Sequence, residues 1–192
     1  MITMHQLLSD LFSLACGQYP AHTSAMGGVW LPCCQRCTGL YGGAGVALAL
    51  HLLWRPGLSS GFLAVHGLFL MIVAPFGFHW LPQGPVLRML TGVLCGFGVA
   101  TFLWVVPANH RAGESGPAST KALWWYGIGL VATLTLLPLT ESCGGRITYW
   151  ALSAAAAMGL FSLAALVLLN VGLACMECRM QAGVRHRRRD GH

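Results

Sequence analysis

Four cysteines near the N-terminus have the spacing of a metal or redox site. Cys34 and Cys37 form a C-x-x-C motif, Cys33 directly precedes it, and Cys16 lies upstream. A two-residue gap lets both sulfurs approach one ion or close a short disulfide, because thiolates are both metal ligands and redox nucleophiles. The sequence therefore predicts either a metal site or thiol–disulfide chemistry in this segment.

The metal hypothesis takes Cys16, Cys34 and Cys37 as three ligands of a tetrahedral zinc or iron site. The fourth ligand stays open and is expected among four other side chains, namely His22, Cys33, His79 and Cys143. A site with four protein ligands is structural, whereas an open fourth position permits catalysis. The identity of the fourth ligand therefore decides what kind of site this would be.

The thiol–disulfide hypothesis covers both a structural disulfide and an oxidoreductase. A C-x-x-C at the outer end of a span, with further outer cysteines, resembles the quinone-linked disulfide-forming membrane proteins. On that pattern Cys34 and Cys37 would face a quinone. Cys16 and Cys143 would form a shuttle pair, and Arg36 would lower the pKa of a thiol.

The segments that must position these cysteines are mostly apolar. The 192 residues are 56% hydrophobic and only 8% charged, whereas soluble domains are about 25% charged. A helix that crosses a bilayer needs ~20 apolar residues, and five apolar runs reach or approach that length. They cover residues 38–54, 57–75, 86–107, 122–139 and 147–174. We predict an all-α integral membrane protein with about five transmembrane helices.

The chain divides into three segments on this pattern. Residues 1–37 hold the cysteines and a run with apolar residues at helical spacing, Leu7, Leu8, Leu11 and Phe12. That spacing predicts an amphipathic helix that lies on the membrane surface. Residues 38–174 form the bundle, and residues 175–192 form a basic tail.

The basic residues predict the orientation in the membrane. With five spans the two ends lie on opposite sides, and the tail is rich in arginine. A cytoplasmic tail places eight basic residues inside and three outside, as the positive-inside rule requires. We therefore expect the N-terminus and the N-terminal cysteines outside and the C-terminus in the cytoplasm. We expect the basic tail to contact lipid head groups rather than nucleic acid.

The first and third spans share a repeated pattern. Residues 38–47 and 91–100 both read T-G-x-x-x-G-x-G-V-A. Each contains a stripe of small residues at four-residue spacing: Gly39, Gly43 and Ala47 in one, and Gly92, Gly96 and Ala100 in the other. Small residues let helix backbones approach closely in lipid. We predict that the two spans cross face to face along these stripes.

The cysteine motif also supports a family resemblance. Cys-Gly-Gln at 16–18, Pro-Cys-Cys-Gln-Arg-Cys-Thr-Gly-Leu-Tyr at 32–41 and Arg-x-x-Thr-Gly at 88–92 resemble the bacterial membrane proteins of domain of unknown function 2085. The resemblance implies a location in the bacterial cytoplasmic membrane. It adds five candidate site residues, Arg36, Thr38, Tyr41, Arg88 and Thr91. It implies an architecture rather than a reaction. The family has histidine after the first cysteine, where this chain has Gly17, so a fourth metal ligand must come from elsewhere.

Two histidines lie inside predicted spans. His51 and His66 are expected at similar depth near the middle of the membrane. Ionisable residues at that depth are candidates for function. The two histidines would either ligate a b-type haem or form hydrogen bonds between helices.

The remaining motifs restrict the function. The sequence contains no Walker loop, no G-x-S-x-G and no paired carboxylates, so nucleotide and hydrolase chemistry are not expected. We expect a small polytopic membrane protein with an external cysteine site, serving as an accessory or assembly subunit of a membrane complex. The alternatives are a quinone-coupled thiol–disulfide oxidoreductase and a transporter of a small solute or lipid. Whether the chain is an enzyme stays open.

Overall fold

The structure, a computed structural model, describes residues 3–77, 80–110 and 119–190, with side chains described as far as residue 181. Five of its helices are long and apolar enough to cross a membrane, which confirms the predicted all-α membrane fold. The helices are α1 (Met4–Ser13), α2 (Gln35–Trp54), α3 (Ser60–Gly77), α4 (Pro85–His110), α5 (Thr120–Cys143) and α6 (Arg146–Asp190), with a 3-10 turn η1 (Pro20–His22).

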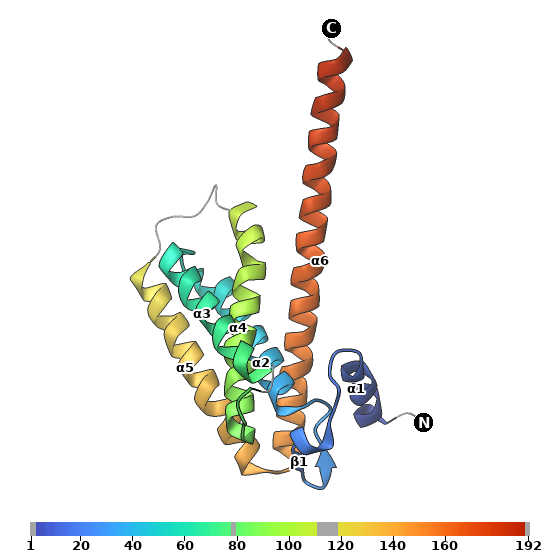
Figure 1. Cartoon of the computed structure of the whole chain (residues 1–192), viewed down its shortest axis with the longest axis vertical. Helices are drawn as coiled ribbons and strands as arrows, with labels where there is room; N and C mark the ends of the chain where they lie inside the picture. The colour runs from blue at the N-terminus through green and yellow to red at the C-terminus, as the bar shows by residue number, and fades with distance from the viewer. Residues whose placement is uncertain (1–2, 78–79, 111–118, 191–192) are drawn as a thin grey trace.

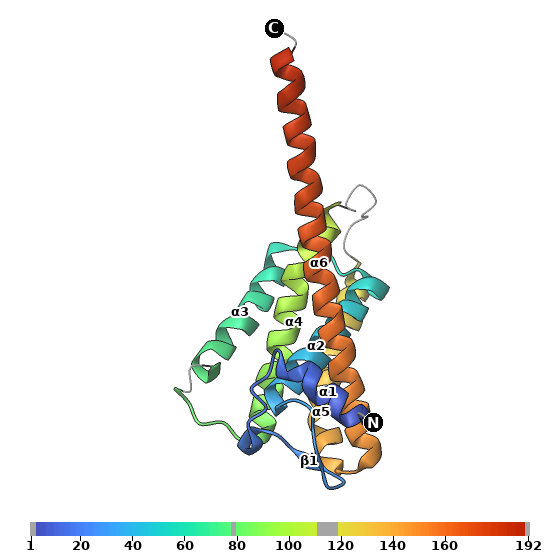
Figure 2. The same cartoon turned by 90° about the vertical axis from the view of Figure 1, so that its right-hand side faces the viewer.

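Helices α2 and α4 form the centre of the bundle (Figure 1). Helix α3 packs on α4, α5 packs on α2, and α6 packs mainly on α2. The N-terminal segment with α1 lies at one end of the bundle, and the C-terminus of α6 extends from the other (Figure 2). The cysteine segment therefore lies at the end of the bundle where α2 and α4 begin.

Glycine allows α2 and α4 to touch backbone to backbone. A Cβ atom on Gly39 would overlap the carbonyl oxygen of Met89, and a Cβ on Gly92 would overlap that of Arg36. These two contacts are reciprocal, because the partners occupy equivalent positions in the repeat. The next turn repeats the arrangement, with Gly43 against Val93 and Gly96 against Leu40.

The two small-residue stripes thus lie against each other, and the helices are related by a pseudo-twofold axis along the bundle. The stripes end at Ala47 and Ala100, which are fully buried in the main core with Phe97. The packing of α3 on α4 and of α5 on α2 follows the same symmetry. The repeat in sequence therefore corresponds to a repeat in packing.

A small hairpin precedes α2 and was not predicted. Strand β1 (Ala25–Met26) pairs antiparallel with β2 (Val29–Trp30). Gly27 and Gly28 have φ angles of 58° and 79°. Positive φ at both central residues is the signature of a two-residue type I′ turn, which explains the paired glycines.

The hairpin is fastened to α2 and α5 by polar side chains. Ser24 donates a hydrogen bond to the carboxylate of Glu141 on α5. Gln35, the first residue of α2, donates to the Ser24 hydroxyl at 2.8 Å. These contacts connect the loop before α2 to the end of α5.

Helix α6 is longer than a span. It continues without a break from Arg146 to Asp190, so the described backbone of the predicted basic tail, residues 175–190, is helical. The side chains of the tail arginines beyond residue 181 lie outside the described residues. His110 at the end of α4 contacts Glu177 of α6 at 2.9 Å, which ties the helix to the bundle before it extends further.

Candidate metal centre

Helix α1 brings Cys16 to the bundle by packing one aromatic side chain into it. Phe12 is fully buried, and its ring centroid lies 5.7 Å from that of Tyr41 on α2. Both rings belong to a buried cluster with Cys16, Cys33 and Ala156. The predicted amphipathic helix therefore anchors the first cysteine through its apolar face, and Tyr41 serves as part of that anchor.

Gln18 clamps the loop that follows Cys16. Its side-chain amide donates to the backbone carbonyls of Ser9 and Pro32, both at 2.7 Å. Its backbone has a φ of 47°, in the left-handed region that few non-glycine residues adopt. Gln18 was not among the predicted site residues, although the Cys-Gly-Gln motif was the signal for it. This clamp fixes Cys16 against the start of α2.

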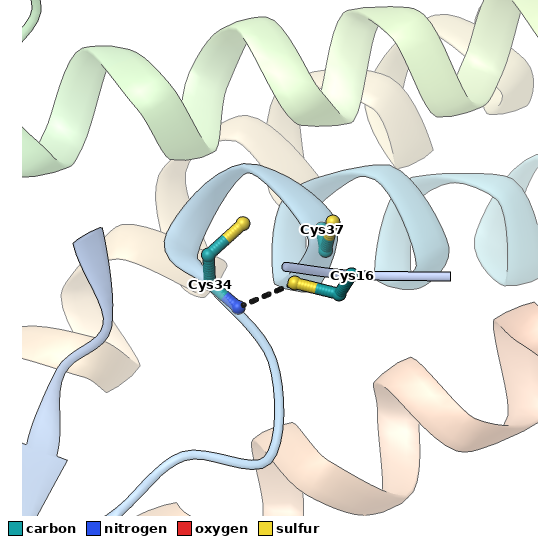
Figure 3. A group of neighbouring side chains, drawn as sticks. All are labelled: Cys16, Cys34 and Cys37. Carbon is teal, nitrogen blue, oxygen red and sulfur yellow. Dashed lines mark hydrogen bonds between the residues drawn. The ribbon is translucent and has the colours of Figure 1, made fainter. Parts of the chain in front are cut away.

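The sulfur atoms of Cys16, Cys34 and Cys37 all lie within 4.8 Å of one another. The backbone N–H of Cys34, the residue that caps α2, donates to the sulfur of Cys16 at 3.3 Å (Figure 3). The positive end of the α2 dipole also points at this site. The structure therefore joins a distant cysteine to the C-x-x-C motif, and we name these three residues the thiol trio.

Hydrogen bonds within the trio shift the charge onto Cys16. Hydrogen bonds from the thiols of Cys34 and Cys37 lower the pKa of Cys16, and burial only partly opposes them. The interaction with Cys16 raises the pKa of Cys34. The site therefore favours a thiolate on Cys16, which is the form of cysteine that binds metals and attacks disulfides.

None of the predicted fourth ligands joins the trio within the described residues. Cys33 is buried, and its sulfur lies 3.3 Å from the Thr38 hydroxyl. Burial raises the pKa of Cys33 to about 12, so this thiol stays protonated. Cys143 is exposed at the end of α5 and lies outside the trio. His79 lies outside the described residues.

A pocket of about 370 Å³ adjoins the trio. His22 lines it, beside Tyr19, whose ring centroid is 6.1 Å away. Phe76, Leu81 and Pro82 form part of the apolar lining. The pocket therefore leads from the thiols to the loop between α3 and α4.

The two candidate arginines line this pocket and hold its loops. Arg36 donates to the Phe76 carbonyl at 3.0 Å and to the Gln83 side-chain oxygen at 3.1 Å. Arg88 makes a long contact of 3.5 Å with the carbonyl of Ala21. Arg36 thus connects the start of α2 to the loop that follows α3.

The two candidate threonines, Thr38 and Thr91, have local roles. Thr38 donates to the carbonyl of Cys34 at 3.2 Å, which supports the first turn of α2. Thr91 donates to the carbonyl of Leu87 at 2.9 Å within α4. Neither hydroxyl is among the residues that line the pocket.

The structure places His51 and His66 in one buried hydrogen-bonded network. His51 on α2 contacts the Thr101 hydroxyl at 3.0 Å, and His66 on α3 contacts the Tyr126 hydroxyl at 2.9 Å. The two hydroxyls are 3.1 Å apart. This chain of four side chains links α2, α4, α5 and α3, and only its two histidines were predicted from the sequence.

One backbone carbonyl, that of Phe62, determines which group donates and which accepts in each hydrogen bond of the network. Nδ1 of His66 contacts the carbonyl of Phe62 at 2.8 Å, and a carbonyl can only accept, so this nitrogen carries the proton. In the neutral ring Nε2 then accepts from Tyr126, Tyr126 accepts from Thr101, and Thr101 accepts from Nε2 of His51. The proton of the His51 ring is therefore on Nε2, and its buried Nδ1, which has no partner among the described residues, carries a lone pair and no proton.

The second C-x-x-C has a different setting. Cys175 and Cys178 are exposed on α6, far along the helix from the trio. All eight cysteines of the chain are free thiols in this structure. The candidate chemistry therefore concentrates at the thiol trio.

Comparison with known proteins addresses the resemblance noted in the sequence. Neither a curated protein nor a solved structure matches the chain. Residues 16–102 match the profile of the family described as "Predicted membrane protein (DUF2085)". This range begins at Cys16 of the trio and ends in α4, so it contains the trio, both arginines and both small-residue stripes. This match supports the resemblance to the DUF2085 family of predicted membrane proteins that the sequence motifs indicated.

Proposed function

We propose that this membrane protein binds one zinc or iron ion through Cys16, Cys34 and Cys37. The convergence of three sulfur atoms within 4.8 Å carries the proposal. Tetrahedral Zn–S bonds of about 2.3 Å place ligand sulfurs about 3.8 Å apart, so small side-chain rotations would close the trio around an ion. Three protein ligands would leave a fourth position open, and the same three cysteines line the adjoining pocket.

Metal content tests the proposal directly. Anaerobically purified protein is expected to contain about one zinc or iron per chain by elemental analysis. Cys34→Ser should lose that metal, because serine does not supply a thiolate. Cys143→Ser is the matched control, since this exposed thiol lies outside the trio. Absence of metal from the unaltered protein, or its retention in Cys34→Ser, would contradict the proposed site.

Gln18→Leu should weaken metal binding without removing a ligand. The amide of Gln18 holds the Cys16 loop through Ser9 and Pro32. Loss of such a supporting contact typically lowers metal affinity about 10- to 100-fold. Competition with a chromogenic chelator measures the change, and Gln6→Leu on exposed α1 surface is the control. Equal affinities for all three proteins would show that the clamp does not position Cys16.

A thiol–disulfide oxidoreductase is the second candidate, and the same distances favour it. With three sulfurs together, Cys16 can attack a Cys34–Cys37 disulfide, forming a mixed disulfide and releasing one thiolate. This exchange keeps the number of disulfides unchanged, so turnover would need a substrate dithiol that is oxidised as it reduces the protein's disulfide. A quinone would then accept the two electrons and two protons when the Cys34–Cys37 disulfide forms again. Quinone reduction by the reduced protein, abolished in Cys37→Ser, would support this candidate over the metal site.

We infer that the trio faces the outside of the cytoplasmic membrane of a bacterium. The support is the basic character of the sequence at the opposite end of the bundle. A membrane-impermeant maleimide should label Cys143 in intact cells, since this thiol is exposed at the same end as the hairpin. An accessory role in a membrane complex also remains our proposal, and partners that copurify in mild detergent would support it.

A further inference from the structure

The pocket beside the thiol trio is rich in unpaired positive charge. Arg36 and Arg88 both line it, and its described lining includes no aspartate or glutamate. The hydrogen bonds of these arginines go to neutral acceptors, the carbonyls of Phe76 and Ala21 and the amide of Gln83. Neither guanidinium charge is therefore neutralised by a carboxylate among the described residues.

Two hydrogen-bond donors in the wall of the pocket lack acceptors. Nε of Arg36 and Nε2 of Gln83 are buried and have no partner in the described part of the chain. A buried donor without an acceptor costs about 1–3 kcal/mol, more for a charged group. A small rotation of either side chain toward the pocket would pair it with an oxygen placed there. The pocket therefore favours a ligand that brings acceptor oxygens.

The remaining lining residues and the volume of the pocket indicate what the rest of such a ligand, beyond its acceptor oxygens, must be like. Phe76, Leu81 and Pro82 are apolar, and the loop between α3 and α4 that carries two of them lies at an end of the membrane-spanning bundle. The volume of about 370 Å³ exceeds what an inorganic anion needs and lies in the range of small-molecule sites. The ligand thus combines an anionic group with a larger body.

We propose that this pocket binds a phosphate ester, supplied either by an anionic lipid head group or by a small soluble metabolite. Paired guanidiniums are well suited to phosphate oxygens. This inference rests on the proposed metal centre only in the calculation of the net charge beside the pocket. Three thiolates around a divalent ion carry one net negative charge, so the two arginines leave one positive charge for the ligand.

Thermal unfolding in a neutral detergent tests the proposal, with three probes added separately: phosphatidylglycerol, phosphatidylcholine and sn-glycerol 3-phosphate. Phosphatidylglycerol or glycerol 3-phosphate should raise the unfolding midpoint more than phosphatidylcholine does. Arg36→Gln and Arg88→Gln should each weaken binding about tenfold or more, the loss of one charge-assisted contact. Arg146→Gln is the matched control, an exposed arginine at the same end of the bundle and outside the pocket. Arg88→Gln preserves the test if Arg36→Gln fails to fold, because Arg88 makes only the long contact to Ala21.

The outcomes separate the two proposals. Binding of phosphatidylglycerol alone identifies a lipid head group, and binding of glycerol 3-phosphate identifies a soluble ester. Absence of selective stabilisation, or an equal loss in Arg146→Gln, overturns the phosphate pocket. Elemental analysis of the same samples decides the metal centre separately. Phosphate binding without metal would overturn the metal centre and keep the pocket.

Discussion

Gly96→Leu is expected to prevent the bundle from folding, because it separates the two central helices. A Cβ at this position overlaps the carbonyl oxygen of Leu40 and lies 2.7 Å from the backbone nitrogen of Ala44. Both neighbours are backbone atoms of α2, so no side chain can rotate away. Overpacking in a core usually costs about 1–3 kcal/mol, and a rigid backbone clash along a closely packed crossing costs more. We expect loss of monodisperse protein on size-exclusion chromatography in detergent.

Gly127→Leu is the matched control for this substitution. Gly127 lies within α5, and a Cβ there meets nothing within 4 Å. Both changes put leucine at a helical glycine, so any intrinsic gain in helix propensity is shared. Folding of Gly127→Leu with failure of Gly96→Leu would establish the close crossing of α2 and α4. Equal thermal stability of the two variants would contradict it.

Tyr126→Phe should destabilise the protein by about 1–2 kcal/mol while it leaves the core filled. The ring remains, but the hydroxyl that contacts both His66 and Thr101 is lost. Hydrogen bonds between membrane helices average only about 0.6 kcal/mol, and this hydroxyl makes two of them in a site that is 3% exposed. Reversible unfolding in mixed detergent micelles measures the difference.

A double-mutant cycle distinguishes this network from simple packing. Thr101→Val should cost less in the Tyr126→Phe background than in the unaltered protein, because one of the two hydrogen-bond partners of Thr101, the Tyr126 hydroxyl, is already absent while His51 remains. Tyr19→Phe, at a side chain that is 68% exposed, should change stability little. Additive effects of the two core substitutions would show that the hydroxyls of Thr101 and Tyr126 do not act as one network.

The sequence alone was enough to predict three features: the five spans, the small-residue faces along which α2 and α4 cross, and the local cysteine motif. The thickness of the bilayer sets a minimum length for an apolar helix, so composition identified all five spans. The four-residue spacing of Gly39 and Gly43 places them on one face of a helix whatever surrounds it. Likewise, the gap between Cys34 and Cys37 limits how far apart two sulfurs on one turn can lie.

Tertiary structure alone decided which distant side chains complete these sites. Cys16 reaches the C-x-x-C because Phe12 is buried and Gln18 clamps the loop, and neither contact is implied by spacing along the chain. Tertiary structure also gave two adjacent cysteines different surroundings. Cys34 belongs to the thiol trio, whereas the sulfur of Cys33 lies beside the hydroxyl of Thr38.

Tertiary structure likewise decided the hydrogen-bond partners of the two buried histidines. Tyr126 and Thr101 lie on helices far from His51 and His66 in sequence, and the rotation of each helix about its axis brought them together. Local spacing determines which residues share a face of one helix. The crossing of the helices determines which faces meet, and that crossing depends on the close contact of two glycine stripes distant in the chain.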